Sequence, residues 1–198
     1  MAMLKAKAAA RAEALESRAH VSPEVRARQN AARTRLLVDA LARLEPLAAI
    51  ALYCSLEDEP GSTDAIGHLH ARGIAVLLPV LGRQVSWAWF DGWERTTPSW
   101  RRIRQPTTAR LGPEALAQTD AIVVPCLAIG LDGSRLGTGG GWYDRALAHR
   151  RAGAPVIALA SEAELHPTVP TEPHDLSVDA AVTESRVLWF RNSQGGGS

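Results

Sequence analysis

The feature that most constrains the fold of this chain is a series of short apolar runs. Four of them have the length and composition of buried strands, and they lie at residues 48–54, 74–79, 121–125 and 156–160. Helix-forming or irregular segments separate them. Continuous apolar strands that alternate with helices predict a parallel or mixed sheet with both faces covered. We therefore expect an α/β fold of three layers, with a mostly parallel, Rossmann-like central sheet and helices on both faces.

Helices and further strands are expected around these runs. Residues 3–19 are rich in Ala, Lys, Arg and Glu, which favour a helix. A second helix should begin after Ser22, with Pro23 at its first position, and run to about Leu44. The remaining predictions are helices at residues 63–72, around Leu116 and at 141–151, strands at 85–90, 178–183 and 187–190, and irregular structure at 91–113.

The length of 198 residues suits one domain. We expect this domain over residues 1–191, with an N-terminal helical segment, and a flexible tail at residues 192–198 (NSQGGGS). The formal net charge of +1 gives no general attraction to nucleic acid. No apolar run is long enough to span a bilayer, so no membrane partner is expected.

The cysteines and the N-terminus favour a cytoplasmic protein. Cys54 and Cys126 follow no metal-ligand spacing and lie at the ends of strand-like runs, which indicates reduced, buried thiols. Charged residues, among them Arg11 and Glu13, interrupt the first 18 residues. A signal peptide needs a continuous apolar stretch there, so we expect a helix, with a mitochondrial-type presequence as the alternative.

A glycine-rich stretch after the run at 121–125 carries the main functional signal. Residues 135–144 read RLGTGGGWYD, with four glycines in five positions. Such a loop, between a strand and a helix, lets the backbone wrap an oxyanion closely. Arg135 adds a fork-shaped charge suited to phosphate, and Asp144 is placed to hold a magnesium ion beside it. The spacing matches neither a P-loop nor a dinucleotide fingerprint, and the alternative is a tight turn in which Asp144 complements the helix dipole.

The wider sequence resembles the 5-formyltetrahydrofolate cyclo-ligase family, also called 5,10-methenyltetrahydrofolate synthetases. The resemblance covers nearly the whole chain and is most specific at residues 132–137 (DGSRLG) and 141–145 (GWYDR), with Gly139 between them. It also rests on Lys7, Arg11, residues 22–29 (SPEVRARQ), 55–59 (SLEDE), Thr63, 78–79 (LP), Ile103, 105–106 (QP), 123–125 (VVP), Pro170, 174–175 (HD) and 178–179 (VD).

This resemblance implies an ATP-driven ring closure. The family turns 5-formyltetrahydrofolate into 5,10-methenyltetrahydrofolate and releases ADP and phosphate. It implies ATP as co-substrate, Mg2+ as cofactor, and a ligase that works on small molecules. We expect the chain to act as a monomer, with neither nucleic acid nor membrane as partner.

The resemblance also assigns roles to individual residues. ATP-binding positions are Lys7, Arg11, Arg135, Leu136, Gly137, Thr138, Gly139, Gly140, Gly141, Trp142 and Tyr143. Substrate-binding positions are Cys54, Glu59, Thr138, Gly139, Gly140, Gly141 and Trp142. Asp144 and Asp175 match the magnesium positions, and we take Arg135 and Tyr143 as the catalytic residues. Lys7 and Arg11 repel each other on one helix face, which suits an anionic ligand, although a solvated basic face has the same pattern.

Two departures leave a second function open. Thr138 stands where the family usually carries a basic residue, and Trp142 where Tyr is common. Loss of a cation beside the γ-phosphate favours the alternative of a weakly active or non-catalytic folate- or nucleotide-binding protein of the same fold. A third hypothesis is a cysteine-dependent enzyme that uses Cys126 with His174. Arg101, Arg102 and Arg104 are either contacts for the glutamate tail of a folate or a solvated cluster.

Overall fold

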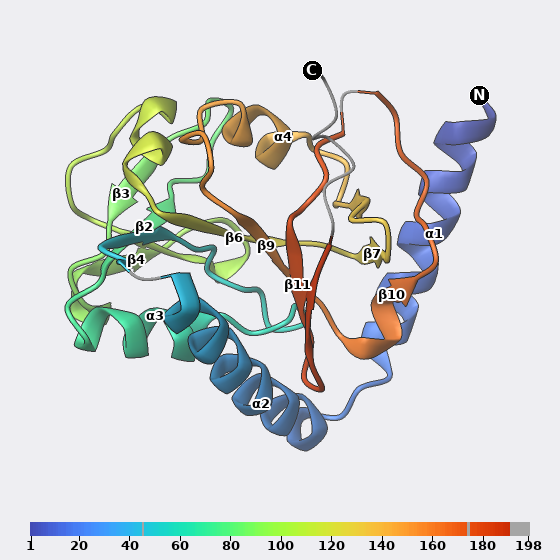
Figure 1. Ribbon diagram of the computed structural model, residues 1–198, viewed down its shortest axis with the longest axis horizontal. Coiled ribbons are helices and arrows are strands. Elements are labelled where there is room, and N and C mark those ends of the chain that lie inside the picture. Colours follow the sequence, from blue (N-terminus) through green and yellow to red (C-terminus); the bar gives the residue numbers. More distant parts are fainter. Residues whose placement is uncertain (45, 174, 191–198) are drawn as a thin grey trace.

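A seven-stranded sheet forms the centre of the molecule (Figure 1). The computed structural model describes residues 1–44, 46–173 and 175–190. The strand order is β12 (Val187–Trp189), β11 (Ala180–Val182), β9 (Val156–Leu159), β6 (Ala121–Pro125), β1 (Ala49–Ala51), β2 (Ala75–Pro79) and β3 (Trp87–Trp89). The inner strands pair in parallel, and the edge strands β3 and β12 run antiparallel to their neighbours. The expected mostly parallel sheet is confirmed.

Helices cover both faces of this sheet. On one face lie α2 (Pro23–Leu41), which continues into the 3-10 turn η1 (Ala42–Leu44), and α3 (Thr63–Ala71). Their apolar residues pack against one side of the strands, and this cluster includes Leu37, Leu41, Ile66, Leu69, Ile50 and Val123. On the other face, the 3-10 helix η4 (Pro113–Gln118) and α4 (Trp142–Leu147) pack with Leu116, Ala146, Leu147, Ile122 and Val124. The three-layer α/β fold is therefore confirmed.

The N-terminal helix α1 (Ala2–Ala19) lies beside a second, smaller sheet (Figure 1). That sheet has the strand order β10 (Leu165–His166), β7 (Ala128–Gly130) and β8 (Arg135–Leu136). The residues of α1 that face the protein include Lys7, Arg11, Ala14 and Arg18, which recur at helical spacing. Because cations rather than apolar side chains dominate this face, polar contacts must hold α1 in place.

Two sequence predictions need correction. The helix expected at residues 141–151 ends at Leu147, and a turn follows. Residues 91–113 are not irregular throughout, because they contain an antiparallel pair, β4 (Thr96–Pro98) and β5 (Arg104–Pro106), and the 3-10 turns η2 (Trp93–Arg95) and η3 (Trp100–Arg102). Hydrogen bonds from the Arg104 guanidinium to Thr96 and Trp93 support this hairpin. Such contacts leave no hydrophobic period in the sequence.

A buried ion pair anchors the C-terminal end of α1. Arg18 Nε donates to Glu164 Oε1 at 2.6 Å, and Arg18 Nη2 donates to the carbonyl oxygen of Cys126 at 2.5 Å. Both side chains are buried. Burial alone would lower the pKa of Arg18, but the hydrogen bond and charge of Glu164 outweigh it and raise that pKa. The Arg18 guanidinium therefore stays charged.

Two further sequence predictions concern a membrane span and the C-terminal tail. Within the described residues, no helix is long and apolar enough to cross a membrane. The tail expected at residues 192–198 lies outside the described residues.

Replacing Arg18 by Met should lower the free energy of unfolding by about 3–5 kcal/mol, because it leaves the Glu164 carboxylate buried without its partner. Urea denaturation measures this change. The double variant Arg18→Met/Glu164→Gln should recover part of the loss, since it removes the stranded charge. A cost below about 1 kcal/mol for the single variant, as for an exposed pair, would contradict a buried anchor.

Candidate active site

A pocket of about 650 Å3 opens at the carboxyl ends of β1, β2 and β6. Tyr53 and Cys54 follow β1, whereas Pro79 and Pro125 end β2 and β6, and all four line the pocket. Ligands of parallel α/β sheets bind at this edge. Every residue to which the family resemblance assigned a role lines this pocket: Lys7, Arg11, Cys54, Glu59, residues 135–144 and Asp175.

The glycine loop connects β8 to α4 and forms one wall of the pocket. Gly139 has φ of 98° and Gly141 has φ of 60°, so both need the conformational freedom of glycine. Arg11 Nε donates to the carbonyl oxygen of Gly137 at 2.9 Å, which fixes α1 on the loop. A Cβ at residue 139 would also lie 3.1 Å from the Arg11 guanidinium carbon. Because α4 is so short, its dipole can add less to anion binding than a helix to residue 151 would.

Two cations beside the loop make three contacts with carboxylates. Lys7 Nζ donates to Glu172 Oε2 at 2.7 Å and to Asp175 Oδ2 at 2.5 Å. Arg135 Nη2 donates to Asp144 Oδ1 at 2.8 Å. The Lys7 and Arg135 side chains are each only 5% exposed. Burial alone would lower the pKa of Lys7, but hydrogen bonds and charge from Asp175 and Glu172 outweigh it and raise that pKa, so the amine stays protonated.

Two buried donors in the pocket wall lack a hydrogen-bond partner among the described residues. They are Arg135 Nε and Trp142 Nε1. Buried polar atoms without partners are uncommon in folded proteins, and each one needs an explanation. Both residues line the pocket. A ligand with acceptor oxygens would satisfy such donors, as a phosphate would.

Glu59, Trp142 and Tyr143 also line the pocket. Burial raises the pKa of Glu59, whose Oε2 accepts from the backbone N–H of Leu56 at 2.8 Å. Burial, together with the nearby Glu59, raises the pKa of Tyr143 well above its usual value, so its phenol stays protonated at neutral pH. Trp142 contacts the ring of Tyr143 edge to face, with 4.9 Å between the ring centroids. These groups offer a flat ligand an aromatic wall, a hydrogen-bond donor and a carboxylate.

The two cysteines are neutral thiols. Burial raises the pKa of both Cys54 and Cys126 to about 12. Cys126 Sγ also donates to the carbonyl oxygen of Leu159 at 3.2 Å. His174, the base in the cysteine-enzyme hypothesis, lies outside the described residues. A thiol nucleophile needs a lowered pKa, so this environment disfavours that hypothesis.

The carboxylates fit a magnesium ion that keeps waters and phosphate oxygens as ligands. Asp144 and Asp175 line the same pocket as the glycine loop. Among the described residues, no group of three or more His, Cys, Asp or Glu side chains is placed to hold a metal. Mg2+ is usually held by one or two carboxylates beside phosphates. The donor set therefore suits Mg2+.

The sequence predictions missed one acidic residue of the pocket, and they left the role of the three arginines at 101, 102 and 104 undecided. Glu172 lines the pocket and shares Lys7 with Asp175, although a single Glu between prolines has no distinguishing pattern. Of the three arginines at 101, 102 and 104, Arg101 lines the pocket. Arg104 instead hydrogen-bonds Thr96 and belongs to the β4–β5 hairpin.

Comparison with known proteins agrees with this geometry. Residues 3–184 match the model of the 5-formyltetrahydrofolate cyclo-ligase family. The chain belongs to this family. It is 34% identical over 143 residues to the 5-formyltetrahydrofolate cyclo-ligase of Mycolicibacterium smegmatis, which covers 69% of this chain and 74% of that protein.

Longer alignments to other relatives agree. The mouse 5-formyltetrahydrofolate cyclo-ligase is 28% identical over 194 residues, which covers 90% of this chain and 94% of the mouse protein. The solved structure of Aquifex aeolicus 5,10-methenyltetrahydrofolate synthetase has a TM-score of 0.81 at 26% identity and covers 97% of this chain and 96% of that one. The cyclo-ligase family is a family of ligases, and its fold extends over nearly the whole chain described above.

Alkylation of the two thiols should be slow and should accelerate with pH up to at least pH 10. With pKa values of about 12, roughly one thiol in ten thousand is ionised at pH 8, and only the thiolate reacts. The rate of reaction with iodoacetamide, followed by mass spectrometry, measures this dependence. Urea-unfolded chain is the control and should level off near pH 9. A plateau below pH 9 for either cysteine in the folded chain would show a reactive thiolate.

Proposed function

We propose that this chain catalyses the ATP-dependent cyclisation of 5-formyltetrahydrofolate to 5,10-methenyltetrahydrofolate, with release of ADP and phosphate. The observation that carries the proposal is the convergence on one pocket of a glycine loop, two cations paired with carboxylates and a desolvated glutamate. Triphosphate and folate can meet there at the carboxyl ends of parallel strands. The names of the family and of its relatives give the same reaction.

The chemistry explains why both charged and neutral groups are needed. The formyl group on N5 is amide-like, and its oxygen is a poor leaving group. Transfer of the γ-phosphoryl group of ATP to that oxygen makes it a good one. N10 then attacks the formyl carbon, loses its proton, and the carbon–oxygen bond breaks as phosphate departs. The protein must align the two substrates, stabilise the charge that moves, and exclude water.

Lys7, Arg11 and Arg135 are the cations proposed to bind the triphosphate. The unpaired Nε of Arg135 is a donor already desolvated beside the loop, which makes it the best candidate to stabilise the transferred phosphoryl group. Lys7 and Arg135 engage carboxylates in the free chain, and they can exchange these partners for phosphate oxygens when the nucleotide binds. The backbone from Leu136 to Gly141 would follow the phosphates.

Asp144 and Asp175 are the residues proposed to hold magnesium. When bound, Mg2+ neutralises phosphate charge and withdraws electrons from the phosphoryl group. Without ligands each of these two carboxylates contacts a cation, Asp175 with Lys7 and Asp144 with Arg135. Binding of the metal alone would break these contacts, which leaves Arg135 without a counter-charge and Lys7 with Glu172 as its carboxylate partner. We therefore expect metal and nucleotide to bind together.

The folate is proposed to contact Glu59, Trp142, Tyr143 and Cys54. Glu59 can accept paired hydrogen bonds from the amino-pyrimidine edge of the pterin. Trp142 offers a flat apolar contact, and the protonated Tyr143 can donate to the substrate but cannot act as a base near neutral pH. Cys54 adds a small neutral surface. We further propose that residues 1–191 form one domain that works as a monomer in the cytoplasm.

The alternative is a folate- or nucleotide-binding protein with little or no turnover. Thr138 motivates it, because this residue brings no cation to the loop. Arg145 does bring one close, since its Nη1 donates to the carbonyl oxygen of Gly140 at 3.2 Å. This contact favours the enzyme over the binding protein.

Purified chain with 5-formyltetrahydrofolate, ATP and Mg2+ should form the methenyl product, which absorbance of its conjugated system follows. Arg135→Met should lower kcat by about 10²–10³-fold, because it removes a preorganised donor from the transferred phosphoryl group. Arg151→Met is the matched control, since Arg151 is half exposed and pairs with Asp120 away from the pocket. Binding of both substrates without product by the unmodified chain would replace the enzyme with the binding protein.

ATP and Mg2+ together should stabilise the folded chain, and leaving out either one should abolish most of this stabilisation. At about 100 times Kd, the two together should raise the melting temperature by roughly 5–10 °C. Mg2+ alone, or ATP with EDTA, should shift it much less, because each leaves one half of the charge exchange incomplete. Asp144→Asn should remove the magnesium-dependent part. Equal shifts from ATP with and without Mg2+ would argue against these metal ligands.

A further inference from the structure

The acidic turn at residues 55–62 carries Glu59 into the pocket, so its position decides where that carboxylate lies. The neck of the turn is closed by reciprocal hydrogen bonds. Ser55 N donates to Ser62 Oγ at 3.1 Å, and Ser62 N donates to Ser55 Oγ at 3.2 Å. The Tyr53 hydroxyl donates to the carbonyl oxygen of Pro60 at 2.5 Å. These contacts come from the turn itself or from the chain just before it.

A contact from a different element holds the far side of the turn. Asn30, in the middle of α2, accepts a hydrogen bond from the backbone N–H of Gly61 at 2.9 Å through Oδ1. The same oxygen accepts from Arg33 Nη1 at 2.8 Å. Asn30 therefore joins the turn to a side chain of α2 that is itself fixed.

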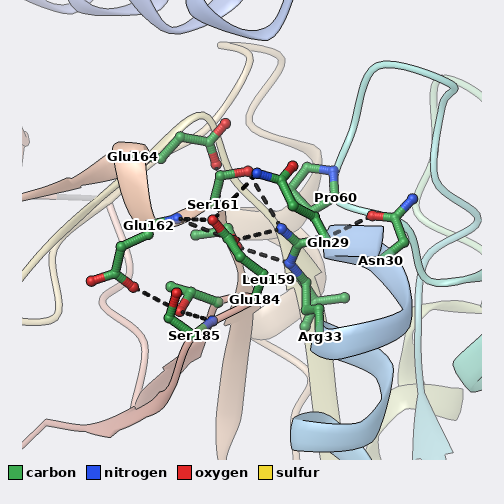
Figure 2. A network of polar contacts seen from close by, with 12 residues as sticks. Gln29, Asn30, Arg33, Pro60, Leu159, Ser161, Glu162, Glu164, Glu184 and Ser185 are labelled. Atoms are coloured by element: carbon green, nitrogen blue, oxygen red, sulfur yellow. Dashed lines mark hydrogen bonds and ion pairs between the residues drawn. The ribbon is translucent and has the colours of Figure 1, made fainter. Parts of the chain in front are cut away.

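Arg33 fixes Asn30 to the central sheet (Figure 2). Its side chain is 1% exposed, and Nε donates to the carbonyl oxygen of Ala160, directly after β9, at 2.9 Å. Nη2 donates to Glu184 Oε2 at 3.0 Å and lies 3.4 Å from Ser161 Oγ. In Figure 2, Ser161 and Glu184 lie on one side of the Arg33 side chain and Asn30 on the other. A rigid path therefore runs from the sheet through Arg33 and Asn30 to the turn.

The contact with Asn30 explains why residue 61 is a glycine. A Cβ at residue 61 would lie 2.5 Å from Asn30 Nδ2 and 2.6 Å from Asn30 Cγ. Gly61 does not belong to the glycines with positive φ, so backbone conformation does not demand glycine there. The close approach of the Asn30 side chain does. Gly61 thus contacts Asn30 through its backbone N–H, and its lack of a side chain leaves room for the Asn30 amide.

We infer that Asn30 is a positioning residue that sets the place of Glu59 in the pocket. This inference rests on the proposed function, in which Glu59 recognises the pterin. Asn30 is not among the described residues that line the pocket, so it acts on the substrate through the turn. Glu59 has one carboxylate oxygen engaged by Leu56 N within the turn, and a shift of the turn moves the whole carboxylate. The consequence is a specific effect on folate affinity, with the ATP side of the pocket left intact.

The first test compares ligand affinities rather than turnover. Asn30→Ala should weaken binding of 5-formyltetrahydrofolate, measured by calorimetry, by about tenfold, as expected for the loss of one positioned hydrogen bond. The affinity for ATP with Mg2+ should change by less than about twofold, since no contact to the glycine loop changes. Asn30→Asp keeps the acceptor for Gly61 and should restore most of the affinity. Exchange of the Gly61 amide hydrogen should accelerate in Asn30→Ala.

The matched control removes another partner of Arg33. Ser161→Ala removes a different hydrogen-bond partner of the Arg33 guanidinium, one that does not contact the turn at residues 55–62 in any contact named above. It should lower stability but leave the affinity for 5-formyltetrahydrofolate unchanged. If Ser161→Ala weakens folate binding as much as Asn30→Ala does, general stability and not positioning is responsible, and the inference is wrong.

The second test uses the close approach at Gly61. Gly61→Ala should weaken folate binding in the unmodified chain, because the new methyl group meets the Asn30 side chain. In the Asn30→Ala background the same substitution should have little further effect, since the atoms that it meets are gone. Equal effects of Gly61→Ala in both backgrounds would overturn the inference.

These tests separate the inference from the proposed function. A chain that binds 5-formyltetrahydrofolate but makes no product contradicts the proposed reaction, while the affinity ratios still decide the role of Asn30. A chain that makes product with unchanged folate affinity in Asn30→Ala keeps the function and contradicts the positioning role. Absence of folate binding by the unmodified chain would overturn both.

Discussion

The contacts of Lys7 with Glu172 and Asp175 are the constraint on which the rest of the site depends. They join residues that are 165 and 168 positions apart, and they hold α1 against the segment that follows β10. The inward face of α1 is rich in cations rather than apolar side chains, so apolar burial cannot place it. Arg11 on the loop carbonyl of Gly137 and the buried Arg18 complete the attachment. Without these polar contacts the pocket would lose one wall and two of its proposed phosphate-binding cations.

The same contacts explain how a charged pocket is compatible with a stable fold. Buried charges are costly unless they are paired, and Lys7 and Arg135 each have a carboxylate within 2.8 Å. The proposed metal ligands and the proposed phosphate ligands therefore neutralise each other until ATP and magnesium arrive. Among the residues proposed to bind folate, burial avoids a charge altogether, because it keeps the Cys54 thiol neutral and the Tyr143 phenol protonated. The pocket thus combines paired charges with neutral side chains.

Much of this could be predicted from the sequence, for physical reasons that also mark its limit. Continuous apolar runs predicted the buried strands β6 and β9, and glycine spacing predicted a loop at the sheet edge. The β4–β5 hairpin escaped because side-chain hydrogen bonds such as those of Arg104 support it, and these leave no periodic pattern. The length of α4 was overestimated for a related reason, since helix-forming residues continue beyond Leu147 while the chain turns. Glu172 and Asn30 could not be found either, because their importance comes from partners far away in the sequence.

The central claim is that ATP and a folate meet on the glycine loop and that the γ-phosphoryl group passes to the formyl oxygen. The most direct measurement follows that oxygen. 5-Formyltetrahydrofolate labelled with oxygen-18 in the formyl group is converted by the chain in unlabelled water, and the inorganic phosphate is analysed by mass spectrometry. The account predicts one oxygen-18 atom in each phosphate, because the formyl oxygen leaves with the transferred group. Unlabelled phosphate, with the label released into water, would contradict it.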